Sequence, residues 1–176
     1  MSKYFMENRE LLFLLLLVVL STVLPHPDNV TPIGALGLFA GCYVRKSGFL
    51  LLPVAAAFLA DITTIGIYSV LIMFFVYTGH LLSSLCGRYF VRDRSIAMGL
   101  PVGVIAASLG FYLVSNIGNW WVYQPHTLAG LIECYTLGLP YLARTLLGNA
   151  LYASLFFGAY ALFGQFIARE GFAERR

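Results

Sequence analysis

Two oppositely charged side chains stand in largely apolar stretches of this chain. Asp61 is a carboxylate and Arg144 is a guanidinium. An ionisable group at membrane depth is costly, needs a partner and marks a candidate functional site. We therefore expect Asp61 and Arg144 to pair, either as two groups that face a ligand or as a structural clamp between two helices.

Two further side chains have types and surroundings that suit ligand contact. His26 stands between two prolines, which stiffen its backbone, so its imidazole is suited to contacting a ligand or a metal ion. An interfacial histidine in a turn is the alternative. Tyr77 lies in an apolar stretch, where its hydroxyl needs a partner when it is buried.

Asn119, Trp120 and Trp121 form a third candidate group. The two indoles are typical of the aromatic belt at a membrane interface, or they form a flat lid over a bound ring system. The chain has no GxSxG, HExxH, P-loop or glycine-rich nucleotide motif. Without such a template we predict that the protein is not an enzyme.

The composition is that of an integral membrane protein. It is 60% hydrophobic and 11% charged, with mean hydropathy +0.82, whereas a soluble domain carries about 25% charged residues. One transmembrane domain, 1–176, accounts for the length, with membrane lipids as partners. The net charge of +3 does not indicate nucleic-acid binding.

The basic residues predict the topology, because Lys and Arg collect in short cytoplasmic loops. Ten of the eleven fall into four clusters, and Arg144 stands alone. The clusters are Lys3/Arg9, Arg45/Lys46, Arg88/Arg92/Arg94 and Arg169/Arg175/Arg176. If all four are cytoplasmic, the chain crosses the membrane six times, both termini are cytoplasmic and Arg144 lies on the outer side.

This topology predicts an all-α bundle of six transmembrane helices. The predicted helices are 10–24, 32–44, 49–60, 69–86, 95–115 and 141–167, with a short interfacial segment at 127–137. The second and third are shorter than the roughly 20 residues of a full crossing. Irregular backbone at membrane depth is tolerated only inside protein or along a cavity. We therefore expect a cavity that opens outward, with the loops around His26, Asp61 and 120–126 above it.

Four segments resemble a known family of bacterial membrane proteins. They are 24–36 (LPHPDNVTPIGAL), 57–61 (AFLAD), 116–138 and 145–149 (TLLGN). They are similar to the substrate-binding S-components of energy-coupling factor (ECF) vitamin transporters, and most similar to the solitary cobalamin-uptake group. The resemblance implies six helices and an outer ligand cavity in the bacterial inner (cytoplasmic) membrane.

The resemblance also implies roles for particular residues. His26, Asp61, Tyr77 and Arg144 match the positions that bind cobalamin, and His26 is the candidate for a cobalt contact. No cysteine lies between Asp61 and Tyr77, which argues against thiolate-dependent cobalamin chemistry. Helix 1 also lacks the Ala-xxx-Ala face with which many S-components dock on the ECF energising module, which favours either a solitary protein or a different docking surface.

Together these observations predict a membrane protein that captures a vitamin-like small molecule from outside, with cobalamin or a related corrinoid as the leading ligand and no permanent cofactor. Two alternatives stay open. One is a membrane-embedded enzyme that acts on a lipid or cofactor. The other is a structural subunit of a membrane complex, in which the polar residues form an internal clamp. The substrate, energy source and oligomeric state do not follow from the sequence.

Overall fold

The computed structural model describes residues 8–44 and 47–173, and every regular element in these residues is helical. The elements are α1 (Asn8–Val23), α2 (Ile33–Tyr43), the 3-10 turn η1 (Ser47–Leu50), α3 (Leu51–Thr64), α4 (Val70–Cys86), the π-helical turn η2 (Gly87–Val91), α5 (Ile96–Tyr123) and α6 (Leu128–Ala173). The predicted all-α class is confirmed. Predictions that rest on Lys3, Arg45, Lys46, Arg175 and Arg176 fall outside the described residues.

Three helical stretches are long and apolar enough to cross a membrane: Val70–Val91, Ile96–Tyr123 and Leu128–Leu162. The helices α2 and α3 have 11 and 14 residues. At 1.5 Å per residue they rise only about 17 Å and 21 Å, which is less than the roughly 30 Å hydrocarbon core. The predicted shortness of these two helices is confirmed.

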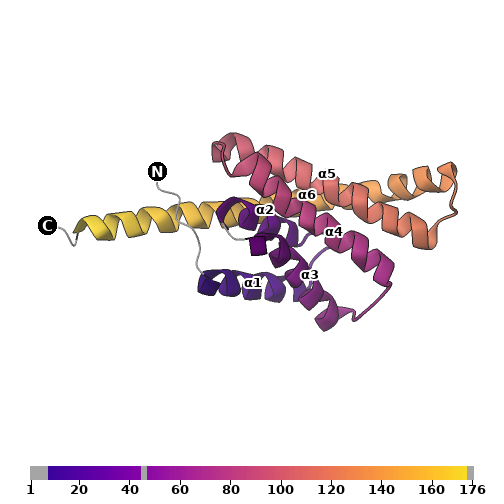
Figure 1. Cartoon of the computed structure of the whole chain (residues 1–176), viewed down its shortest axis with the longest axis horizontal. Helices are drawn as coiled ribbons and strands as arrows, with labels where there is room; N and C mark the ends of the chain where they lie inside the picture. The colour runs from indigo at the N-terminus through magenta and orange to yellow at the C-terminus, as the bar shows by residue number, and fades with distance from the viewer. Residues whose placement is uncertain (1–7, 45–46, 174–176) are drawn as a thin grey trace.

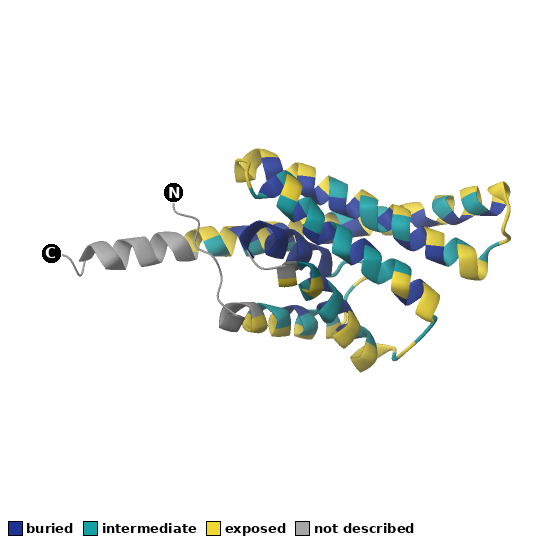
Figure 2. Ribbon diagram, in the orientation of Figure 1, coloured by how far each residue is buried: buried dark blue, intermediate teal, exposed yellow. Residues whose placement is uncertain are grey.

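The short helix α2 forms the centre of the molecule, and all of its residues are buried (Figure 2). The end of α4 and the η2 turn come close to α2 because glycines stand on both sides of the contact. A Cβ atom on Gly41 would collide with the backbone of Ser84 and Arg88, and one on Gly87 would collide with the carbonyl of Leu38. The Gly37-xxx-Gly41 spacing is typical of such close helix packing, and here it serves a contact within the chain.

On a second face of α2, aromatic side chains pack against aromatic side chains of α6. The ring of Phe39 meets the ring of Phe157 edge-on at 5.3 Å, and the rings of Tyr43 and Tyr160 lie 4.1 Å apart. These residues belong to a buried cluster that also includes Ala107 of α5. The centre is therefore built from α2, α4, α5 and α6, with α1 and α3 packed along one side (Figure 1).

The predicted connection between the last two helices is wrong. We expected a helix ending at 115 and a separate segment at 127–137, but α5 continues to Tyr123 and α6 begins at Leu128 and runs through Pro140. The two ends pair with each other: the Tyr112 hydroxyl donates to the carbonyl of Tyr135 (2.5 Å), and the Tyr135 hydroxyl donates to that of Leu113 (2.6 Å). This pairing extends both helices into a hairpin.

The connections lie at two opposite ends of the elongated molecule (Figure 1). The α5–α6 hairpin projects at one end, and the α3–α4 connection faces the same way. The η2 turn, the first turn of α1 and the last turn of α6 lie at the other end. The segments therefore run back and forth along one axis, as expected for a membrane bundle.

Candidate ligand-binding cavity

A cavity of about 390 Å³ lies among the helices, near the α1–α2 and α3–α4 connections. Both connections and residues from every helix contribute to its lining. Gly34 near the start of α2 and Ala57 and Ala60 of α3 keep side-chain bulk out of it. The space exists because α2 and α3 are short and carry small residues where they meet the connections.

Asp61 lines this cavity from the last turn of α3. Its carboxylate oxygen Oδ2 accepts hydrogen bonds from the hydroxyls of Tyr77 (2.9 Å) and Tyr68 (3.3 Å). Burial raises the pKa of Tyr68, and the charge of Asp61 raises it further, so this phenol keeps its proton and remains a donor. Tyr77 thus donates a hydrogen bond to Asp61, although Tyr77 itself is not among the residues that line the cavity.

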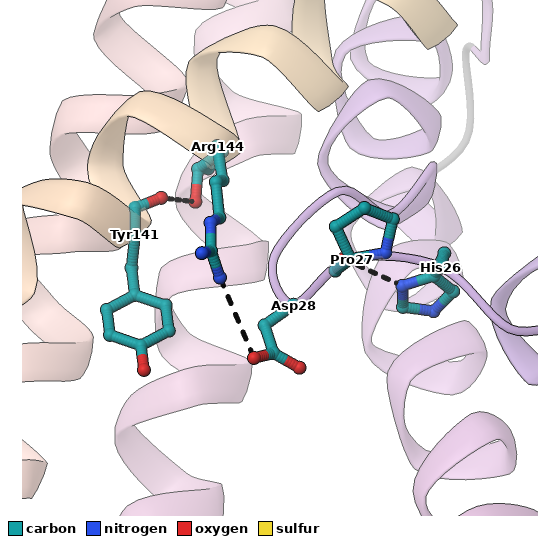
Figure 3. Close-up of polar contacts among 6 residues, drawn as sticks. His26, Pro27, Asp28, Tyr141 and Arg144 are labelled. Carbon is teal, nitrogen blue, oxygen red and sulfur yellow. Dashed lines mark hydrogen bonds and ion pairs between the residues drawn. The ribbon is translucent and has the colours of Figure 1, made fainter.

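Arg144 has a different partner from the one that we expected. Its Nη1 atom lies 3.7 Å from Oδ2 of Asp28, and the two side chains point toward each other from α6 and the α1–α2 connection (Figure 3). Its guanidinium also lies over the ring of Tyr141, 5.5 Å from the centroid. In the described residues no ion pair joins Arg144 to Asp61, so the predicted pairing is wrong.

The packing of the α1–α2 connection explains why Arg144 pairs with Asp28. Gly148 of α6 has no side chain, and Val30 and Thr31 pack so closely there that a Cβ on it would lie 3.1 Å from Cα of Val30. Asn29 adopts a left-handed backbone conformation (φ 62°), which Asn tolerates better than most residues. This seated turn places Asp28 beside Arg144.

His26 also lines the cavity, but the backbone engages both of its ring nitrogens. Nδ1 lies 2.9 Å from the carbonyl oxygen of Pro27, and Nε2 lies 2.8 Å from that of Thr22. A neutral imidazole carries one N–H, so it can donate to only one of these two carbonyls, and the lone pair of the other nitrogen faces the second carbonyl. A cobalt contact by His26 would require the ring to turn away from that carbonyl.

Asn119, Trp120 and Trp121 lie toward the far end of α5 and do not line the cavity. The Trp120 indole N–H donates to the carbonyl of Pro125 (3.0 Å). Both indoles pack with His126, at centroid distances of 5.6 Å and 4.9 Å. These contacts close the hairpin tip, and the half-exposed Trp121 suits a membrane interface.

The floor of the cavity carries polar residues that the sequence analysis did not select. His80 is 9% exposed, and its ring stacks on Phe111 at 4.7 Å. Asn149 is buried and donates to the hydroxyl of Ser108 (2.9 Å). Ser83 is also buried at this floor. The signal that could have found them is a polar side chain in mid-helix, since such residues face the bundle interior.

These lining residues are suited to binding a small molecule. The described part of the chain contains no group of three His, Cys, Asp or Glu side chains that could hold a metal ion. What the cavity offers is one carboxylate held by two phenols, a histidine at the floor and apolar walls. Such a set can orient a small molecule by hydrogen bonds and charge.

Comparison with known proteins gives the family. The family model described as "Family of unknown function (DUF6580)" matches residues 5–170, and the chain belongs to this family. No curated protein and no solved structure matches the chain.

Proposed function

We propose that this protein is a membrane-embedded binding protein that takes a small polar molecule from the outer side of the membrane, in the manner of an S-component, and carries it inward. The single observation behind the proposal is the cavity of about 390 Å³ that all six helices surround. Pockets for small organic ligands begin at about 300 Å³. Its lining combines apolar walls with a few convergent polar groups, as such pockets do.

The charge distribution supports an outward opening. Arg88, Arg92 and Arg94 lie in and after η2, at the end away from the α3–α4 connection that lines the cavity (Figure 1). Lys and Arg mark the cytoplasmic side of a membrane protein. On this basis the chain crosses a bacterial inner membrane six times, with both termini inside and the cavity facing out.

The cavity is small compared with cobalamin, the ligand that the sequence favours. At about 30 Å³ per water molecule, 390 Å³ has room for roughly a dozen waters. A corrinoid, with its macrocycle and nucleotide tail, has many times more atoms. Cobalamin therefore stays in the proposal only as a ligand that opens the cavity, and a smaller vitamin-like molecule fits the observed shape better.

The two alternatives have less support. A structural clamp would leave a dry interior between the polar residues, whereas these residues border a ligand-sized space. A membrane enzyme needs a nucleophile or a general base in reach of the substrate, and the Asp61 carboxylate is the nearest candidate. Transport with an ECF energising module and transport by the solitary protein are both compatible with the proposal.

Two neighbouring threonines provide a matched test. Thr64 is exposed and lines the cavity, whereas Thr63 is exposed and does not. Both hydroxyls bond to a carbonyl four residues back, at 2.8 Å. The protein would be purified in mild detergent from cells grown in rich medium, and small molecules released by heat would be identified by mass spectrometry.

We expect a molecule that co-purifies in near-stoichiometric amount with wild type and Thr63→Trp and is reduced at least tenfold with Thr64→Trp. For the same three proteins we would measure the binding of added cobalamin. We would also measure uptake of the co-purified molecule into vesicles that contain no ECF energising module. Equal retention by all three, or no retained molecule and no uptake, would rule out the proposed function.

A further inference from the structure

We propose that the ligand of this cavity is a small organic cation with N–H donors and an apolar or aromatic body. The inference rests on the proposed function and adds the chemical class of the substrate. It comes from the charge of the cavity lining and from the hydrogen-bond groups that lie beside that charge.

Four of the hydroxyl groups that line the cavity donate their hydrogen to the protein backbone. Those of Thr22, Thr64, Ser83 and Thr145 each donate to a backbone carbonyl of their own helix, at 2.8, 2.8, 2.6 and 2.9 Å. A hydroxyl has one donor hydrogen and two acceptor lone pairs. Toward a ligand these four side chains can therefore act only as acceptors.

His26 gives away its donors in the same way. Both of its ring nitrogens lie against backbone carbonyls, so it offers no N–H to the cavity. Asn149 uses one of its two amide N–H groups on Ser108 (2.9 Å), and its Oδ1 atom abuts Gly34, a cavity-lining residue. Asn29 and Thr31 also line the cavity, and their side chains can donate as well as accept, so it is the charge of the lining that decides the class of ligand.

The charge of the cavity lining favours a cationic ligand. Its acidic groups are Asp28 and Asp61. Asp28 is paired with Arg144 at 3.7 Å, and that pair is neutral as a unit. Asp61 has only phenol neighbours, both on Oδ2, so in the described residues no cation balances it and its Oδ1 atom accepts no hydrogen bond. A ligand cation would supply the missing charge.

The remaining groups fit the other end of such a ligand. His80 is nine-tenths buried at the floor, and its ring nitrogens have no hydrogen-bond partner in the described part of the chain. A neutral imidazole offers one donor and one acceptor. Val76, Ala107 and Phe111 supply apolar wall. A planar ring could lie against Phe111 while its cationic group meets Asp61.

Three isosteric probes separate charge from shape: benzamidine is a cation, benzamide is neutral and benzoate is an anion. Their binding to the detergent-purified full chain would be measured by calorimetry, after removal of any co-purified molecule. A charge-assisted hydrogen bond contributes about 1.5–3 kcal/mol. We therefore expect benzamidine to bind roughly ten- to a hundredfold more tightly than benzamide, with benzoate weakest.

Asp61→Asn should remove the preference for benzamidine over benzamide and change benzamide binding by less than about threefold. The matched control Asp93→Asn removes one exposed carboxylate that does not line the cavity, and it should keep the preference. Size-exclusion profiles report whether each variant is folded, and the order of the three probes on wild type is decisive even if Asp61→Asn fails to fold.

Equal or reversed affinities on wild type, a preference that survives in folded Asp61→Asn, or no binding of any probe would overturn the cation assignment. The proposed function would survive those results if a neutral or anionic molecule co-purified and Thr64→Trp excluded it. The two failures are thus distinguishable.

Discussion

The helix α2 packs closely against the end of α4 and the η2 turn, and Gly41→Ala should weaken this contact. A Cβ on Gly41 would lie 2.8 Å from the backbone nitrogen of Arg88 and closer still to the carbonyl oxygen of Ser84. Ordinary contact begins at 3.4 Å, so the helices must separate by at least 3.4 − 2.8 = 0.6 Å. Both neighbours are backbone atoms, which no change of rotamer can move.

A gap of 0.5–1 Å already removes about a quarter to a half of a van der Waals contact. Forcing extra volume into a packed core costs about 1–3 kcal/mol. For a chain of this size roughly 2–4 °C in Tm corresponds to 1 kcal/mol. We therefore expect Gly41→Ala to lower the Tm in detergent by roughly 2–12 °C, as measured by scanning fluorimetry, and to weaken ligand retention.

Gly110→Ala is the matched control, because its Cβ would meet only Leu82, at 3.5 Å. Alanine is favoured over glycine in a helix by about 1 kcal/mol, so this variant should melt at or slightly above the wild-type temperature. If Gly41→Ala and Gly110→Ala have the same Tm, then the packing of α2 on the end of α4 and η2 is not as close as described, and this prediction is wrong.

Three further predictions concern the site and the topology. Tyr77→Phe should cost about 1–3 kcal/mol because Asp61 loses a donor at 2.9 Å; calorimetric or denaturant unfolding that shows no loss would refute this contact. Arg144→Gln should cost less than about 1 kcal/mol, since the ion pair is 3.7 Å long and its side chains are 46% and 77% exposed; a Tm drop above about 5 °C would contradict that. A cysteine placed at Asn119 should react with an impermeant maleimide from outside and one placed at Ser95 should not, and the reverse pattern would invert the topology.

The sequence predicted the part of the site that depends on local chain features. Asp61 ends a short helix and His26 stands in a proline-stiffened turn, and both line the cavity. Tyr77 was expected to need a partner, and it bonds to Asp61. These predictions follow from residue type and helix length, which a single sequence shows directly.

Residue type and helix length alone could not decide which acidic residue pairs with Arg144. Which acid meets Arg144 depends on how the α1–α2 connection seats on Gly148, and this is a tertiary contact. His80 and Asn149 were missed for the same kind of reason. Their position along α4 and α6 was visible, but the face that they present depends on how the helices rotate against α2.

The hairpin formed by α5 and α6 illustrates a different limit. The predicted helix ended at 115, just before Asn116, yet Asn116 continues α5, is buried and donates from its side-chain amide to the carbonyl of Tyr112 (2.8 Å). Helices accept such residues when their side-chain amide bonds back to the preceding turn. Polar composition alone therefore placed the end of α5 too early.

The most direct test of the central claim is an experimental structure of the protein with its co-purified molecule bound. We predict density for that molecule inside the cavity, with a ligand nitrogen at hydrogen-bonding distance from Oδ1 of Asp61 and a polar atom facing His80. A cavity that is collapsed or filled by a lipid chain, with the molecule bound elsewhere, would contradict this account.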